Sequence, residues 1–366
     1  RSAGGAPMTR SQAECAAWIG AGVGLIGLAV GSFAAPAAFT AAFPHAWLAA
    51  LTAWLGWPIG CMGLLLIHAL TGGRWGYAIR PQLVAGMSTL LLLPPAVIPL
   101  YLVLPTLYPW THADVAAHLD NRFYLNLPFF LGRGVIYLVV WLGLAGLILR
   151  ALRRDMPDAR LARIAPIGLI LLSITVTYAA IDTTMSLDPR FASSTYGLIA
   201  IAETGLLALS VSIFAVVLGP PLDHTTLRSL GKLLLGLLIL WAYLDFMQLL
   251  IVWQSDLPNE APWYIVRSTG GWGIAAALVA GCHFVLPFFA LLSPRLQSSP
   301  RGIACVTAML IVSEVVRGWW LVVPASERSF DPADVLAMLG LIGIATAVAL
   351  RAPLSPEMPE IVRHHG

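Results

Sequence analysis

Three carboxylates stand inside or at the end of long apolar stretches, where acidic residues are rare. They are Asp182, Glu203 and Asp245. A carboxylate in the middle of a membrane helix costs about 2.5–3.5 kcal/mol, whereas one leucine returns only about 0.3–0.6 kcal/mol. Glu203 and Asp245 have no basic residue within one turn of their own predicted helices. Each is therefore a functional candidate that needs a polar or hydrated partner.

These carboxylates and two neighbours could relay protons through the outer half of a membrane. Tyr178 precedes Asp182 by one helical turn, which predicts that the two share a face. Arg133 lies in the outer part of another apolar stretch. Burial and a nearby arginine shift the pKa of a carboxyl group in opposite directions, so such a cluster can be tuned for proton exchange near neutral pH. The alternative for Arg133 is a structural role, in which it neutralises a carboxylate on a neighbouring helix.

Two histidines could continue this relay through the inner half of the membrane, because histidine titrates near physiological pH. His68 could instead hydrogen-bond a loop carbonyl at the inner interface, and His283 could be a packed, satisfied core residue. The two are not at matched depth, so a haem ligated by both is poorly supported. Glu314 and Arg317 are spaced i and i+3, which predicts a structural ion pair.

These residues belong to about ten apolar segments, each near the 20 residues that a helix needs to cross a bilayer core. The predicted segments are 15–36, 46–70, 82–104, 123–150, 161–181, 195–219, 229–253, 268–292, 302–323 and 334–351. The chain is 58% hydrophobic and only 11% charged, whereas a soluble domain averages about 25% charged residues. We expect an all-α integral membrane protein, with one polytopic membrane domain over residues 1–366. The net charge of +3 gives no sign of nucleic-acid binding, because the basic residues sit at helix ends.

The character of the loops repeats along the chain. A basic turn follows the second and the sixth segment, and a long loop rich in proline and aromatic residues follows the third and the seventh. This echo predicts two four-helix bundles, 46–181 and 195–323, with two peripheral helices outside them. Paired glycine or proline breaks at matching midplane positions are not found in the sequence, which argues against a stand-alone transporter.

Arginine and lysine are distributed unequally between the two sides. One side would hold Arg1, Arg10, Arg74, Arg80, Arg150, Arg153, Arg154, Arg160, Arg163, Arg228, Lys232, Arg295, Arg301, Arg351 and Arg363. The other would hold Arg122, Arg190, Arg267 and Arg328, among acidic residues that include Asp114, Asp120, Asp188, Asp256 and Glu260. The positive-inside rule predicts that the first side, with both termini, is cytoplasmic.

The cysteines are scattered singly, at Cys15, Cys61, Cys282 and Cys305. Without a CxxC spacing, the motifs for iron–sulfur clusters, structural zinc and c-type haem attachment are absent from the sequence. Together with the unmatched histidines, this pattern predicts that the chain itself binds no metal and no haem.

Several long and unusual stretches resemble one family of membrane proteins. They are HALTGGRWGYAIR (68–80), LYPW (107–110), FYLNLPFFLGRGVIY (123–137), IDTTMSLDPRFASSTYG (181–197), LGKLLLGLLILWAYLDFMQLLIVWQSDLPNEAPWY (230–264) and RSTGGWG (267–273). Over most of its length the chain is similar to the second quinone-binding-type membrane subunit of bacterial alternative complex III. That family in turn resembles the polysulfide-reductase membrane subunit, with two four-helix bundles flanked by two further helices.

The resemblance implies a subunit of a quinol:cytochrome c oxidoreductase complex in the bacterial inner membrane. The chain itself would hold no cofactor and would not be catalytic alone. The implied partners are a sister membrane subunit of the same fold, an extracytoplasmic iron–sulfur subunit, c-type cytochrome subunits that carry haem c, small membrane subunits and lipid. The implied roles are proton conduction and completion of the membrane core. The alternatives are a quinone or quinol site in this chain and a purely structural anchor. Relatives often carry a hydroxyl-bearing or smaller residue in place of Asp245. The resemblance therefore implies less about the role of Asp245 than about the other residues.

Overall fold

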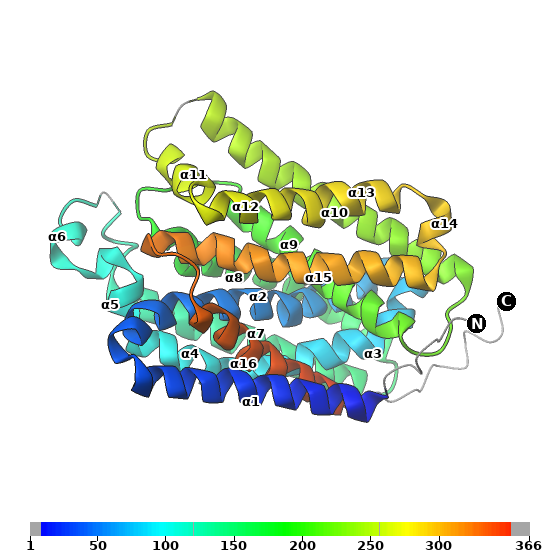
Figure 1. Cartoon of the computed structure of the whole chain (residues 1–366). Coiled ribbons are helices and arrows are strands. Elements are labelled where there is room, and N and C mark those ends of the chain that lie inside the picture. Colours follow the sequence, from blue (N-terminus) through cyan, green and yellow to red (C-terminus); the bar gives the residue numbers. More distant parts are fainter. Residues whose placement is uncertain (1–8, 120, 256, 353–366) are drawn as a thin grey trace.

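The chain folds into a bundle of long helices, seen in a computed structural model that describes residues 9–119, 121–255 and 257–352 (Figure 1). Ten helical segments in these ranges are long and apolar enough to cross a membrane. This finding confirms an all-α, multi-pass membrane protein. The expectations for Arg1, Asp120, Asp256 and Arg363 fall outside the described residues.

Six of the ten segments are single helices, and the other four contain a change of helix type. The single helices are α1 (Arg10–Ala34), α2 (Pro36–Thr71), α7 (Leu127–Leu152), α9 (Tyr196–Val217), α10 (His224–Gln254) and α16 (Pro332–Arg351). The other four combine elements: α3 (Arg74–Ser88), η1 (Thr89–Leu92) and α4 (Leu93–Leu102); α8 (Pro157–Thr183) and η3 (Met185–Leu187); α12 (Gly271–Leu278), the π-helical η4 (Val279–Val285) and α13 (Leu286–Leu291); α15 (Pro300–Val322) and η5 (Val323–Ser326). The final turn of α16 passes directly into the loop at Ala352.

The short elements lie at the two ends of the bundle. The end with α5 (Leu104–Leu107), η2 (Pro109–Thr111), α6 (Ala113–Ala116) and α11 (Ala261–Ser268) lies opposite the end with α14 (Pro294–Gln297), as Figure 1 shows. We refer to the first as the α6 end and to the second as the α14 end. At the α6 end, the hydroxyl of Tyr108 donates to the carbonyl of Thr183 at 3.0 Å, which holds this loop against α8.

α2 and α9 pack against each other at the centre of the molecule. We refer to α2, α3–α4, α7 and α8 as the first bundle, and to α9, α10, α12–α13 and α15 as the second. α2 also contacts α3 and α8, whereas α9 also contacts α10 and α15. The approach of α2 to α9 needs glycine at position 60, because a Cβ there would collide with the backbone of Thr204.

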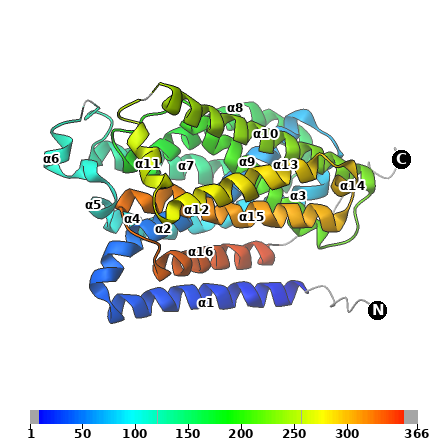
Figure 2. The same cartoon turned by 45° about the horizontal axis from the view of Figure 1, so that its top comes forward.

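The two peripheral helices, α1 and α16, form a pair beside this core (Figure 2). Their backbones approach closely, since a Cβ on Gly24 would collide with Gly340. Arg10 Nε donates to the carbonyl of Leu350 at 2.7 Å, so the start of α1 lies beside the end of α16. α16 then packs against α2, which joins the pair to the rest of the molecule.

The main differences from the predicted segments lie at the starts of the helices. α2 begins at Pro36, with only Ala35 between it and α1, whereas the sequence predicted a loop over 37–45. Proline is favoured in the first turn of a helix and the alanines that follow are strong helix formers, so this stretch continues as helix. The basic turn before the third segment is also helical, because α3 begins at Arg74 rather than near residue 82.

Candidate functional site

The first bundle holds a closed ion pair between Arg133 of α7 and Asp182 at the end of α8. Nε and Nη2 of Arg133 donate to the two carboxylate oxygens of Asp182, each at 2.8 Å. Tyr137, one turn along α7, donates its hydroxyl to the same carboxylate at 2.6 Å. The remaining Nη1 of Arg133 donates to the carbonyl of Tyr124 at 3.0 Å. Such bidentate, charge-assisted contacts are strong, and they leave this pair fully engaged.

Tyr178 takes no part in this pair, so its expected link to Asp182 is corrected. Its side chain is 46% exposed, and its ring lies 6.4 Å from that of Tyr124. Asp182 instead faces α7, whose Arg133 and Tyr137 engage both of its oxygens. The spacing of one turn between Tyr178 and Asp182 on α8 therefore did not predict the partner of Asp182. Its carboxylate is oriented by Arg133 and Tyr137 of the neighbouring helix α7.

The second bundle holds a more open arrangement around Arg317 of α15. Its guanidinium pairs with Glu203 of α9, and its Nη2 lies 3.4 Å from Asp245 Oδ1 of α10. The predicted ion pair between Glu314 and Arg317 is wrong: among the described residues, Arg317 is paired with carboxylates from two other helices. Its long side chain crosses to α9 and α10, whereas Oε2 of Glu314 faces His283 of η4.

Glu314 lies between Glu203 and His283. Its carboxyl group is within hydrogen-bonding reach of that of Glu203, and its Oε2 lies 3.8 Å from His283 Nε2. Glu314 and His283 are 6% and 2% exposed, so both are buried. We refer to Glu203, Asp245, Glu314 and Arg317 as the Arg317 cluster. His283 adjoins this cluster, whereas the sequence grouped it with His68.

His68 is held in a local contact at the end of α2. Its Nε2 donates to the carbonyl of Gly73 at 3.0 Å, and its ring packs edge-on against Trp75 and Tyr77. This is the alternative in which the histidine bonds a loop carbonyl. It closes the turn from α2 into α3.

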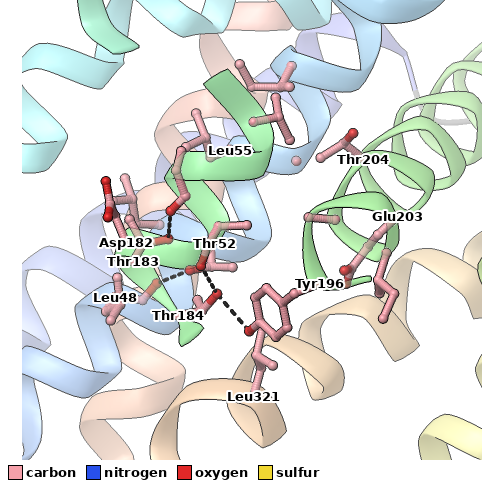
Figure 3. A pocket seen from close by; sticks show the side chains of 18 of the residues that line it. Leu48, Thr52, Leu55, Asp182, Thr183, Thr184, Tyr196, Glu203, Thr204 and Leu321 are labelled. Carbon is pink, nitrogen blue, oxygen red and sulfur yellow. Dashed lines mark hydrogen bonds between the residues drawn. The ribbon is translucent and has the colours of Figure 1, made fainter. Parts of the chain in front are cut away.

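A cavity of about 170 Å³ lies between the two bundles. Asp182 and Glu203 lie on opposite sides of it in Figure 3. Most of its wall is apolar, and hydroxyl groups are set along it, from Thr52, Thr184, Tyr196 and Thr204 among others. The volume has room for roughly five water molecules. The cavity therefore connects the Arg133–Asp182 pair with the Arg317 cluster.

Sequence reasoning missed a group of polar residues between Asp245 and the α6 end. Gln248 lies one turn from Asp245 on α10 and is 5% exposed. Its amide oxygen accepts from Ser193 Oγ at 2.6 Å, and its amide nitrogen donates to the hydroxyl of Tyr264 at 2.9 Å. Burial raises the pKa of Tyr264, so this phenol stays neutral. The i, i+3 spacing of Asp245 and Gln248 was the one signal that could have found them.

The described residues contain no group of three or more histidine, cysteine, aspartate or glutamate side chains arranged to hold a metal ion. Neither the protein-family models nor the curated proteins compared with this sequence give a match. The chemistry of the site is therefore read from its own geometry.

Proposed function

We propose that this chain conducts protons across part of the membrane as a non-redox, integral subunit of a quinol-oxidising complex. The observation that carries the proposal is the composition of the Arg317 cluster. One guanidinium faces the carboxylates of Glu203 and Asp245, and Glu314 lies beside them. A proton can then join or leave one carboxyl group while Arg317 keeps an anionic partner. A one-to-one buried pair cannot do this without leaving a charge unpaired.

The surroundings of the cluster support a route for protons. Ser193, Gln248 and Tyr264 form a hydrogen-bonded path from the loop at the α6 end to the turn beside Asp245. On the other side of the cluster, the cavity offers room for water beside Glu203. Water and the hydroxyl groups of Ser193 and Tyr264 can pass protons, whereas the Gln248 amide does not titrate and positions these two hydroxyls.

The assignment to a complex is supported by the long motifs that resemble the alternative complex III subunit. Under this proposal the chain lies in the bacterial inner membrane beside a sister subunit of the same fold. The iron–sulfur and c-type cytochrome subunits would dock at the α6 end, outside the cytoplasm. The exposed arginines of the turn between α7 and α8, among them Arg153 and Arg154, support a cytoplasmic α14 end.

Reporter fusions test this orientation. A fusion after Arg154 should be active as a cytoplasmic reporter, and a fusion within residues 111–120 should be active as an extracytoplasmic one. The opposite pattern would refute the orientation and, with it, the placement of the partner subunits.

The proton role is tested with the complexes that carry Asp245→Asn and Glu203→Gln. Asparagine and glutamine still form hydrogen bonds but do not titrate in this range. We expect both complexes to assemble and to show impaired proton translocation in liposomes. Wild-type rates of quinol oxidation and of proton movement, in both variants, would refute the proposal.

A second candidate function is quinol binding, favoured by the mostly apolar wall of the cavity and the carboxylates at its edge. A quinol site predicts normal assembly, slowed quinol oxidation and altered inhibitor binding in the same two variants. A purely structural anchor predicts instead that Asp245→Asn acts mainly on assembly.

A further inference from the structure

Three buried polar atoms around Glu314 lack a hydrogen-bond partner among the described residues. They are Glu314 Oε2, His283 Nε2 and Trp241 Nε1. The ring of Trp241 packs edge-on against that of His283, with centroids 4.4 Å apart, so the three belong to one place. A buried polar atom left unpaired costs about 1–3 kcal/mol, and several together are unusual in a native core. This arrangement is suited to proton transfer, because the Glu314 carboxyl group is an acid, the His283 imidazole is a base, and neither facing atom has another hydrogen-bond partner among the described residues.

The hydrogen bonds around Ser313 fix the tautomer of His283. The hydroxyl of Ser313 donates to the carbonyl of Leu310 at 3.0 Å, which uses its only proton. Its oxygen lies 2.8 Å from His283 Nδ1, and this contact therefore requires a proton on Nδ1. In the neutral ring Nε2 then carries a free lone pair, and this is the atom that faces Glu314. The imidazole is thus set up as an acceptor for a proton from Glu314.

The helix that carries His283 departs from the α form at this position. Residues Val279–Val285 form a π-helical segment between α12 and α13, and His283 lies inside it. π-helical turns insert an extra residue into a helix and occur frequently at functional sites. The segment packs against α15, the helix of Ser313 and Glu314.

We propose that Glu314 and His283 form a proton-exchanging pair that extends the Arg317 cluster into the middle of the second bundle. This inference rests on the proposed proton role, and it names the residues through which the proton leaves the cluster. In the resting pair the proton is on Glu314 and His283 is neutral, because a low-dielectric interior disfavours two separated charges. In the transfer step the two atoms close from 3.8 Å to hydrogen-bond distance, the Oε2–H bond breaks and an Nε2–H bond forms, which gives a carboxylate and an imidazolium. The net charge of the pair does not change.

A contact with Glu203 supplies the pair with protons. A hydrogen bond between the carboxyl groups of Glu203 and Glu314 needs one proton on the two groups. After Glu314 has given its proton to His283, Glu203 takes up a second proton from the cavity while Arg317 keeps Asp245 as its anionic partner, and Glu203 then passes this proton to Glu314. The atoms that exchange protons therefore run from Glu203 to Glu314 to His283, and Ser313 is a positioning residue that holds the imidazole.

Infrared spectroscopy of the intact complex tests the pair without any measurement of transport. We expect a carbonyl stretch from a protonated carboxyl group that disappears in Glu314→Gln. In His283→Gln this band should remain but shift, because the acceptor opposite the acid has changed. Absence of such a band, or a band whose frequency is the same in His283→Gln as in the wild type, would overturn the proposal.

Nitrogen-15 resonance of labelled histidine tests the tautomer. We expect His283 to be protonated at Nδ1 in the wild type and to become a mixture of tautomers in Ser313→Ala. Ser210→Ala is a matched control, since Ser210 is also buried and its hydroxyl donates to the Leu206 carbonyl of its own helix. A fixed Nε2–H tautomer in the wild type would contradict the assignment.

Proton movement in liposomes then places the pair in the relay. His283→Gln removes a positioned proton acceptor, so we expect a loss of about 100-fold. Ser313→Ala removes one hydrogen bond to the ring and should cost about tenfold. Normal movement in His283→Gln, together with impaired movement in Asp245→Asn, would refute the extension alone. Normal movement in Asp245→Asn and Glu203→Gln would refute the proposed relay, while the infrared result would still decide whether the two groups share a proton.

Discussion

Each bundle buries one arginine among carboxyl groups, and the two sites differ in how many acids the arginine meets. In the first bundle, Arg133 meets Asp182 in a bidentate contact, and Tyr137 adds a third bond. In the second, Arg317 is divided between Glu203 and Asp245, and it leaves Glu314 to other neighbours. A closed pair holds helices together, whereas a shared arginine leaves protons free to move. The same residue types therefore form two different kinds of ion pairing in the two bundles.

The largest expected effect comes from breaking the closed pair. In Arg133→Leu the buried carboxylate of Asp182 loses its cation, which should destabilise the protein by about 3–5 kcal/mol. Thermal unfolding of the purified protein in detergent measures the loss. The double variant Arg133→Leu/Asp182→Leu should recover much of the stability, because no buried charge is left. A single variant as stable as the wild type would show that the pair is not structural.

Tyr137→Phe removes one bond to the Asp182 carboxylate and leaves the ion pair in place. A hydrogen bond to a charged group contributes about 1.5–3 kcal/mol, so we expect a loss of that size. Tyr101→Phe is the matched control, since Tyr101 lines the same cavity and its hydroxyl makes no hydrogen bond among the described residues. Equal losses in the two variants would mean that the contact with Asp182 is unimportant.

Asp245→Asn should change stability by less than about 1 kcal/mol. Its carboxylate is 39% exposed and lies 3.4 Å from Arg317, which keeps Glu203 as its nearer partner. The same change at Asp182, whose side chain is 2% exposed, should cost several times more because Arg133 is left uncompensated. Unfolding of the two variants side by side is the measurement. A similar loss in both would remove the contrast between the bundles.

The smallest expected effect concerns the residues that cap α7 and α10. Asp223 caps α10 through a bond from the Thr226 backbone at 2.8 Å, whereas Asn126 caps α7. Hydrogen bonds from Thr225 and Thr226 lower the pKa of Asp223. Its contribution to stability is therefore complete above its ordinary pKa of about 3.9 and is lost as the pH falls through the lowered folded value. Asp223→Asn should change stability by only a few tenths of a kcal/mol at pH 7. It should also reduce the fall of the midpoint temperature of unfolding as the pH is lowered. A variant whose midpoint temperature falls with pH as steeply as that of the wild type would contradict this.

The helices were predictable from the sequence because each membrane-crossing segment must be long and apolar enough on its own. A run of about 20 apolar residues is needed whatever the other helices do. All ten predicted segments overlap a long helix of the structure. The start of α2 at Pro36 was missed, although proline at a first turn favours a helix.

The site was predictable only in its membership. Burial cost identifies Glu203, Asp245 and Asp182 without knowledge of neighbours, but the partner of each depends on how distant helices pack. Arg317 could be assigned to Glu314 from spacing alone, yet Glu203 lies over a hundred positions earlier and pairs with it across helices. The π-helical segment around His283 has no pattern in the sequence that marks it.

The pairing of α1 with α16 has a consequence for biogenesis. α1 leaves the ribosome before every other described helix, whereas α16 leaves after all of them. The contact between Gly24 and Gly340 therefore forms only when the other long helices have been inserted. Until then the face of α1 that packs on α16 is exposed to lipid. Many side chains of α1 are apolar and exposed, among them Ile19, Ile26 and Phe33, so the helix is compatible with lipid on all sides. Closure of the pair thus requires α16 in the membrane, so a product that stops before α16 lacks this contact.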